Sequence, residues 1–236
     1  MANFGLMRMS VVAPYEPHWR EARSAVGAPE LLKSARETAS LADAVRDCSL
    51  VLGTGTVTHR KAEQPVVLLD KLAPKVTDSL GRKERIALVF GPEKHGLTRE
   101  DLSWCHFLIE IPTDQRQPSM NLGQAAAVCF YELATRVQSF DDGMDTAPQI
   151  PVGGLGMEPD QNAQKTAPDS GNLDVLGNLM EEVMFAANYS PKTMQEANRH
   201  DLRLMLRRLQ FNAADSRRAL GLFRRILHSL NRGRRP

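Results

Sequence analysis

The chain has 236 residues, of which 42% are hydrophobic and 25% are charged, and its formal net charge is +2. This length suits one α/β domain with a smaller unit beside it, because a single core usually serves roughly 100–200 residues. The charge is unevenly spread: residues 190–236 hold twelve Lys and Arg against three acids, a net +9, which leaves −7 for the rest. The composition therefore excludes a uniformly basic chain, and only the C-terminal part suits a polyanion.

Composition also bears on compartment and on metal binding. No apolar run approaches the ~18 residues of a membrane helix, and the start of the chain has no signal-peptide pattern. The three cysteines are odd in number, widely spaced and in apolar contexts, which favours buried thiols over disulfides or metal ligands; they are Cys48, Cys105 and Cys129. We expect a cytoplasmic protein with no metal site and no membrane contact.

The first part of the chain alternates strands with helices. Strands are predicted at 7–14, at 49–53 after a helix that begins at 41, at 86–91 and at 107–112. The amphipathic segment LTREDLSWC lies between the last two strands, where Thr98 can cap a helix, and an Ala-rich helix is predicted over 122–138. This alternation predicts a parallel sheet.

The second part of the chain changes composition twice. Residues 139–174 are rich in Asp, Gly, Pro, Gln and Asn, and they cannot bury enough apolar surface to offset their ordering entropy, which predicts a linker. Helical periodicity returns from Asn172 onward, and Asp215 is predicted to be the N-cap of the last helix. We therefore expect three regions: a domain over 1–138, a flexible linker over 139–174 and a basic helical extension over 175–236.

Three loops could hold a ligand. Gly53-Thr54-Gly55-Thr56 follows a strand, FGPEKHGL places Gly91 at a strand end and Glu93 in the loop, and QPSMNLGQAAA places Ser119 and Asn121 where a helix begins. In an open α/β sheet, ligands bind at such strand ends. Simpler interpretations also stand: a turn without a ligand, a Glu93 that binds backbone donors, and an N-cap formed by Ser119 or Asn121.

In this order and spacing, the three loops resemble the SpoU branch of the SPOUT superfamily of RNA 2′-O-ribose methyltransferases. The resemblance covers about residues 1–138, and its most specific parts are FGPEKHGL and IP…SMNLGQAAAVCFYE. It implies an α/β sheet with a deep C-terminal trefoil knot, an S-adenosyl-L-methionine site formed by the knot, and an obligate homodimer.

The resemblance also implies roles for individual residues. Cofactor contacts fall on Thr54, Gly55, Thr56, Gly91, Ile111, Ser119, Met120 and Asn121. Glu93 and Asn121 would hold the loops and the substrate ribose in place, and the Ser119 hydroxyl would help to remove the ribose proton. No metal is implied.

The basic extension has a weaker resemblance of its own, to the C-terminal helices of TrmJ-type tRNA methyltransferases. Those enzymes act on the first nucleotide of the anticodon loop, position 32, which makes tRNA the expected partner and ribosomal RNA the alternative. Helical spacing of Leu202, Met205, Leu206 and Leu209 leaves the arginines between them to face solvent or RNA. The predicted RNA contacts are Arg203, Arg207, Arg208, Arg217, Arg218, Arg224 and Arg225.

One part of the family pattern is missing. The SpoU first motif, Asn-x-Gly-x-x-x-Arg, supplies an arginine that activates the ribose hydroxyl, and the Asn3-Phe4-Gly5 string that ends at Arg8 has the wrong spacing. Either the start of the chain has been placed about one strand and most of a helix too late, which we favour, or the catalytic arginine is lost. In the second case the protein would be an RNA-binding homodimer without activity.

A third interpretation is a Rossmann-type nucleotide-binding protein. It is disfavoured because no G-x-G-x-x-G opens a helix with an acid about twenty residues later. The histidines beside the loops, His59 and His95, receive no catalytic role, because solitary loop histidines usually face solvent.

Overall fold

The computed structural model describes residues 1–15, 18–22, 27–55, 62–114, 116–137, 166–189 and 191–232. Its strands are β1 (Ser10–Val12), β2 (Arg36–Thr38), β3 (Leu50–Thr54), β4 (Val66–Leu68), β5 (Ile86–Val89) and β6 (Phe107–Glu110). Its α-helices are α1 (Pro29–Ser34), α2 (Leu41–Val45), α3 (Ala73–Gly81), α4 (Arg99–Ser103), α5 (Leu122–Arg136), α6 (Ser170–Ala186), α7 (Gln195–Arg208) and α8 (Ala213–Arg232). Most of residues 139–174 lie outside the described ranges, but α6 begins inside that stretch.

The predicted parallel sheet is confirmed. Its four strands lie in the order β4-β6-β3-β5, and every neighbouring pair is parallel. The predicted strand at 7–14 contains β1, but β1 pairs only with β2 in a separate two-stranded sheet. Four elements were not predicted: β2, β4, α1 and α3. The two strands have three residues each, which is too short to show alternation.

The core lies on both faces of β3, because successive side chains of a strand point to opposite sides. Leu50 and Leu52 pack on one face with α3, α5 and the segment before α3, and Val51 packs on the other face with α2. All three cysteines are buried, as predicted from their apolar contexts: Cys129 belongs to the first cluster, and Cys48 and Cys105 belong to the second. Each Å² of buried apolar surface stabilises a fold by about 25 cal/mol, so these two layers are the main source of stability.

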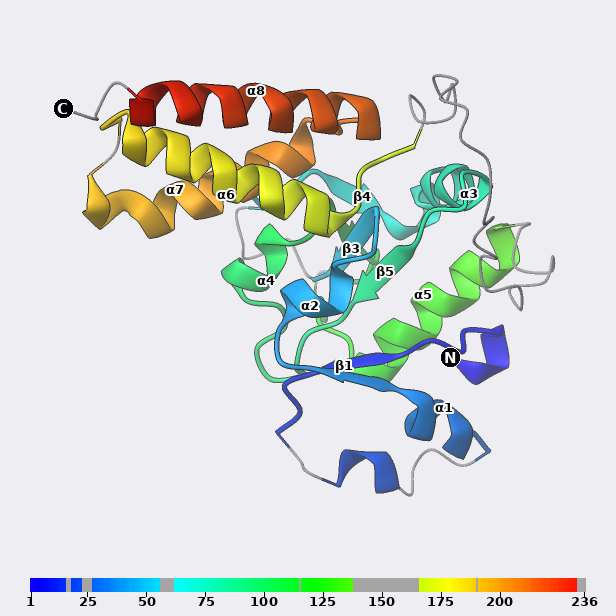
Figure 1. Cartoon of the computed structure of the whole chain (residues 1–236). Coiled ribbons are helices and arrows are strands. Elements are labelled where there is room, and N and C mark those ends of the chain that lie inside the picture. The colour runs from blue at the N-terminus through cyan, green and yellow to red at the C-terminus, as the bar shows by residue number, and fades with distance from the viewer. Residues whose placement is uncertain are drawn as a thin grey trace.

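Helices α6, α7 and α8 form a separate layer at one end of the sheet (Figure 1). Their small core is Leu173, Leu176 and Leu206, against which half-buried side chains of α8 such as Leu220 and Phe223 pack. The start of α6 is bonded to the sheet domain: the Ser170 N–H donates to the Cys48 carbonyl at 2.9 Å, and the Gly171 N–H donates to the Arg46 carbonyl at 2.9 Å. Backbone bonds therefore fix where this layer begins.

Helix starts were predicted with mixed success. Thr98 caps α4 in a reciprocal capping box with Asp101, as its position before an apolar segment predicted. The prediction for α8 was wrong: the cap is Asn212, whose side-chain oxygen accepts from the Asp215 N–H at 2.8 Å. Asn and Asp are equally good caps, so composition alone could not choose between them.

Within the described ranges, none of the helices is both long and apolar enough to cross a membrane.

His106 is the buried polar group that ties β3 to the segment before β6. The ring Nδ1 of His106 accepts from the Val51 N–H at 3.1 Å, and the backbone N–H of His106 donates to the Val51 carbonyl at 2.7 Å. Burial above all, and the charge of the nearby Arg207 second, lower the pKa of the imidazole from 6.5 to about 3. The ring is therefore neutral in the folded protein at neutral pH.

We predict that His106→Ala destabilises the fold by about 1–3 kcal/mol, because the buried Val51 N–H loses its acceptor. His106→Gln keeps an acceptor but does not titrate. Since the folded pKa lies below the unfolded value, the stability that depends on the neutral ring is present above pH 6.5 and is lost as pH falls toward 3. The stability difference between wild type and His106→Gln should therefore shrink from pH 7 to pH 4 in denaturant titrations; a constant difference would contradict this.

Candidate functional site

The three loops singled out in the sequence leave the sheet side by side. Strand β3 lies between β5 and β6, with Gly53 opposite Val89 and Thr54 opposite Ile109. The Thr54 hydroxyl donates to the Val89 carbonyl at 3.1 Å, and the Gly55 N–H donates to the Ile109 carbonyl at 3.4 Å. The first loop is therefore bonded to both neighbouring strands at the carboxyl edge, where open α/β sheets bind ligands.

The second loop folds back tightly on Gly91. A Cβ at this position would lie 2.2 Å from the Gly96 carbonyl carbon and 2.3 Å from the Leu97 nitrogen, which no side chain could accommodate. The return is closed by a bond from the Gly96 N–H to the Pro92 carbonyl at 2.7 Å, and Gly96 adopts a φ of +64°. Both glycines are thus required by the backbone path, independently of any ligand.

Asn121 joins the second and third loops. Its Nδ2 donates to Glu93 Oε1 at 2.8 Å, while its Oδ1 accepts from the Gly123 N–H at 2.8 Å and caps α5. Of the two caps considered from the sequence, Asn121 is therefore the one observed. A single amide both starts the helix and holds the acid of the neighbouring loop.

The remaining predicted cofactor residues lie on the same side of the sheet. Half-buried Ile111 follows β6 directly, and exposed Ser119 and half-buried Met120 precede Asn121 in the third loop. Thr56 and His59 lie outside the described residues. The structure thus brings together the loop starts and the Glu93–Asn121 pair, while the individual roles of these residues in cofactor or substrate binding stay predictions.

Sequence reasoning missed two features of this edge. The first is the packing beneath Gly53, where a Cβ would lie 2.7 Å from Cys105 Sγ and 3.1 Å from Leu97 Cδ1. The second is Glu63, which follows the first loop and bonds both Arg99 and His200. Neither has a sequence signal, because each depends on residues that are distant along the chain.

Five of the seven arginines predicted to contact RNA are exposed: Arg208, Arg217, Arg218, Arg224 and Arg225. Four of them lie on α8 as two pairs spaced seven residues apart, which places them on one side of the helix. Arg232, one further heptad from Arg225, is exposed as well. Helix α8 therefore presents a basic stripe, which we call the α8 stripe, made of Arg217, Arg218, Arg224, Arg225 and Arg232.

The predicted orientation of the other two arginines was wrong. Arg207 is only 2% exposed, and its Nε donates to the Trp104 carbonyl at 3.0 Å. The side chain of Arg203 is 10% exposed, and its Nη1 donates to Ser103 Oγ at 2.8 Å. Periodicity identified one buried face of α7, but this helix packs on two sides, so its charged face is covered by α4 and Trp104.

Among the described residues, no group of three or more His, Cys, Asp or Glu side chains is arranged to hold a metal ion.

Comparison with known proteins gives a consistent result. The sequence model of the SpoU rRNA Methylase family matches residues 1–131. The chain is 37% identical over 134 residues to a tRNA (cytidine/uridine/adenosine-2′-O-)-methyltransferase TrmJ of Pseudomonas aeruginosa, covering 56% of this chain and 52% of the relative. It is 26% identical over 234 residues to a tRNA (cytidine/uridine-2′-O-)-methyltransferase TrmJ of Yersinia pestis, covering 98% of this chain and 84% of that one.

The first of these matches spans about half the length of the curated relative. The fold is similar to a solved structure, TrmJ from Z. mobilis ZM4, with a TM-score of 0.70 at 23% identity over 96% of this chain and 89% of that chain. This likeness includes the helical layer as well as the sheet domain, since it covers nearly the whole chain.

We predict that Asn121→Ala and Asn121→Asp separate the two tasks of this side chain. Alanine removes the cap and the bond to Glu93, and should lower the free energy of unfolding by about 1 kcal/mol or more. Aspartate keeps a capping oxygen but sets two carboxylates against each other, so stability should change less while the second loop is released from the third. Denaturant titration measures the first effect, and hydrogen exchange of residues 91–97 measures the second. Equal protection of these residues in wild type and Asn121→Asp would contradict it.

Proposed function

Because the chain belongs to the SpoU rRNA methylase family, we propose that it transfers a methyl group from S-adenosyl-L-methionine to a ribose 2′-oxygen of tRNA. The observation that supports this proposal is that the three motif loops lie together at the carboxyl edge of the sheet. Thr54 and Gly55 are bonded to the strands on either side, and Asn121 is bonded to Glu93.

The residues at this edge fit the cofactor. The exposed backbone at Gly55 allows close approach of a ligand, and half-buried Ile111 offers an apolar wall for an adenine ring. When bound, S-adenosyl-L-methionine supplies an electrophilic methyl group on a sulfonium. A ribose hydroxyl is a poor nucleophile at neutral pH, so the site must orient it and accept its proton.

We assign the orientation of the ribose to the Glu93–Asn121 pair and the acceptance of its proton to the Ser119 hydroxyl. The Glu93 carboxylate, fixed at 2.8 Å by the Asn121 amide, can accept hydrogen bonds from a ribose and hold it against the loops. Exposed Ser119, two residues before Asn121, can relay a proton from the 2′-oxygen. Ser119, Met120, Thr54 and Thr56 would complete the cofactor contacts.

The choice of tRNA rests on the relatives and on the C-terminal helices. Both TrmJ relatives named above are tRNA methyltransferases, and the similarity to the Yersinia protein extends through the helical layer. The α8 stripe offers exposed arginines to a phosphate backbone, which gives affinity, while selectivity comes from shape and unpaired bases. We propose anticodon-loop position 32 as the target nucleotide, with a ribosomal RNA as the alternative substrate.

We also propose a homodimer with a trefoil-knotted cofactor site, located in the cytoplasm. The apolar surface of α5 supports self-association: Val128 and Tyr131, one helical turn apart, are 37% and 58% exposed. Phe4 of the N-terminal segment lies beside Tyr131, with the two ring centroids 6.4 Å apart. Apolar side chains gathered on one helix are typical of protein interfaces.

A second candidate function is RNA binding without methyl transfer. One observation favours it: Asn3, Gly5 and Arg8 do not have the spacing of the family's first motif. Such a protein would bind S-adenosyl-L-methionine and tRNA, but it would leave every nucleoside unmodified.

We predict that the protein binds S-adenosyl-L-methionine in isothermal titration and does not bind NAD. Gly55→Val should abolish this binding, because a branched side chain would occupy the ligand's approach to the first loop. In cells without the gene, mass spectrometry of tRNA nucleosides should show the loss of one 2′-O-methyl nucleotide. Cofactor binding without any lost nucleotide would favour the second candidate, and absence of cofactor binding would refute the proposal.

We predict that Arg224→Gln/Arg225→Gln weakens tRNA binding and lowers the steepness of its salt dependence. Each lost phosphate contact should reduce the slope of log K against log salt by about 0.7–0.9, or by about 1–2 for the pair. Lys33→Gln serves as the control, because α1 lies at the opposite end of the molecule from α8 (Figure 1). A slope that is unchanged in the double variant would remove the α8 stripe from the RNA interface.

A further inference from the structure

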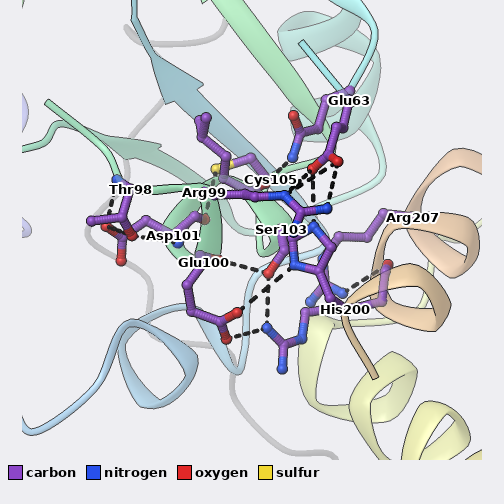
Figure 2. Close-up of polar contacts among 12 residues, drawn as sticks. Glu63, Thr98, Arg99, Glu100, Asp101, Ser103, Cys105, His200 and Arg207 are labelled. Carbon is purple, nitrogen blue, oxygen red and sulfur yellow. Dashed lines mark hydrogen bonds and ion pairs between the residues drawn. The ribbon is translucent and has the colours of Figure 1, made fainter. Parts of the chain in front are cut away.

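Helix α7 is bonded to α4 and to residues beside it by three basic side chains, His200, Arg203 and Arg207 (Figure 2). The sequence had placed the two arginines in solvent or against RNA. His200 Nε2 lies 2.9 Å from Glu63 Oε2, and its Nδ1 lies 3.8 Å from Glu100 Oε2. Arg203 forms an ion pair with Glu100 and donates to Ser103 Oγ at 2.8 Å. Arg207 donates to the Trp104 carbonyl at 3.0 Å. One helix of the C-terminal layer thus holds α4 along its length.

These contacts are more than screened surface ion pairs. Arg203 lies 4.0 Å above the centroid of the Trp104 ring and Arg207 lies 5.1 Å from it, so each guanidinium also makes a cation–π contact. Arg207, Trp104 and His200 are 2%, 9% and 8% exposed. Because the groups are shielded from water, their bonds are directional and costly to break.

The opposite side of α4 supports the candidate cofactor loops. Leu97 and Cys105 flank the helix at its two ends, and both would touch a Cβ on Gly53, at 3.1 and 2.7 Å. The Gly96 and Leu97 backbone presses against Gly91 within 2.2–2.6 Å of where its Cβ would be. Thr98 follows Leu97 directly and caps α4 through its capping box with Asp101, so the second loop continues into the helix with no residue between them. A shift of α4 would therefore displace the Leu97 and Cys105 side chains beside Gly53 and the Gly96–Leu97 backbone beside Gly91.

Glu63 adds a second connection between α7 and this edge. It receives two hydrogen bonds from Arg99 of α4, at 2.7 and 3.1 Å, and one contact from His200 of α7. Those bonds, from Arg99 first and His200 second, lower the pKa of the Glu63 carboxyl to about 2, so the acid is ionised at neutral pH. Glu63 also follows Gly55 closely in the chain.

From this arrangement we propose that His200, Arg203 and Arg207 are positioning residues of the cofactor site: by holding α4 against Gly53 and Gly91, the C-terminal helices set the affinity for S-adenosyl-L-methionine. The helical layer then has two tasks, one through the α8 stripe toward RNA and one through α7 toward the cofactor loops. This inference rests on the proposed function.

The test compares Arg203→Ala with Arg199→Ala in the full chain. Arg199 is the matched control, because it lies on the same helix and its ion-pair partner, Glu181 at 3.0 Å, belongs to α6 within the helical layer. Isothermal titration with S-adenosyl-L-methionine, titration with tRNA and thermal unfolding are measured for both variants. A role limited to stability would lower Tm in either variant without changing cofactor affinity.

We expect Arg203→Ala to raise the Kd for S-adenosyl-L-methionine about three- to thirtyfold, the range of coupling transmitted through packed elements. The Kd for tRNA should change less than twofold, and Arg199→Ala should leave the cofactor Kd unchanged. A folded Arg203→Ala protein that binds the cofactor as tightly as wild type would overturn the inference.

Should Arg203→Ala fail to fold, Glu100→Gln removes the same ion pair from a side chain that is 62% exposed. It should raise the cofactor Kd about threefold, and an unchanged value would refute the positioning role. The outcomes also separate this inference from the proposed function. If wild type binds no cofactor, the proposed function fails, whereas normal wild-type binding with unaffected variants contradicts the positioning role alone.

Discussion

The structure depends on the central place of β3 in a parallel sheet. Leu50, Val51 and Leu52 are at most 7% exposed, and their backbone is bonded to β5 on one side and to β6 on the other. In a parallel sheet every strand ends at the same edge, so the loops after β5, β3 and β6 must emerge together. The candidate site is a consequence of this pairing, and the loop sequences then decide what the edge can bind.

Close backbone approach is the second constraint on this edge. Gly53 and Gly91 each face atoms that lie within 3 Å of where a Cβ would be. The end of β3 therefore packs against Cys105 beside α4, and the second loop packs against its own Gly96–Leu97 backbone. Short polar side chains complete the closure, with Asn121 capping α5 while it holds Glu93. Loops fixed in this way lose little further entropy when they bind a ligand, which favours affinity.

The helical layer is part of this arrangement. Its first turn is bonded to the backbone of Arg46 and Cys48, and α7 covers Trp104 and Ser103 beside the cofactor loops. The arginines of α7 and α8 therefore have two different environments. Arg203 and Arg207 face inward and hold α4, while the α8 stripe faces outward, where a polyanion can reach it. This arrangement joins the elements proposed for the two substrates.

The sequence by itself determined the parallel sheet, the positions of its three main strands along the chain, the cap at Thr98 and the loops that meet at one edge. These follow from local periodicity and from the geometry of parallel strands. It placed the cap of α8 at Asp215 instead of Asn212, and it predicted the wrong environment for Arg203 and Arg207. Only the tertiary structure decided those, because a side chain's burial depends on what packs against its helix. Trp104 lies about a hundred positions away from both arginines, where no local pattern could indicate the contact.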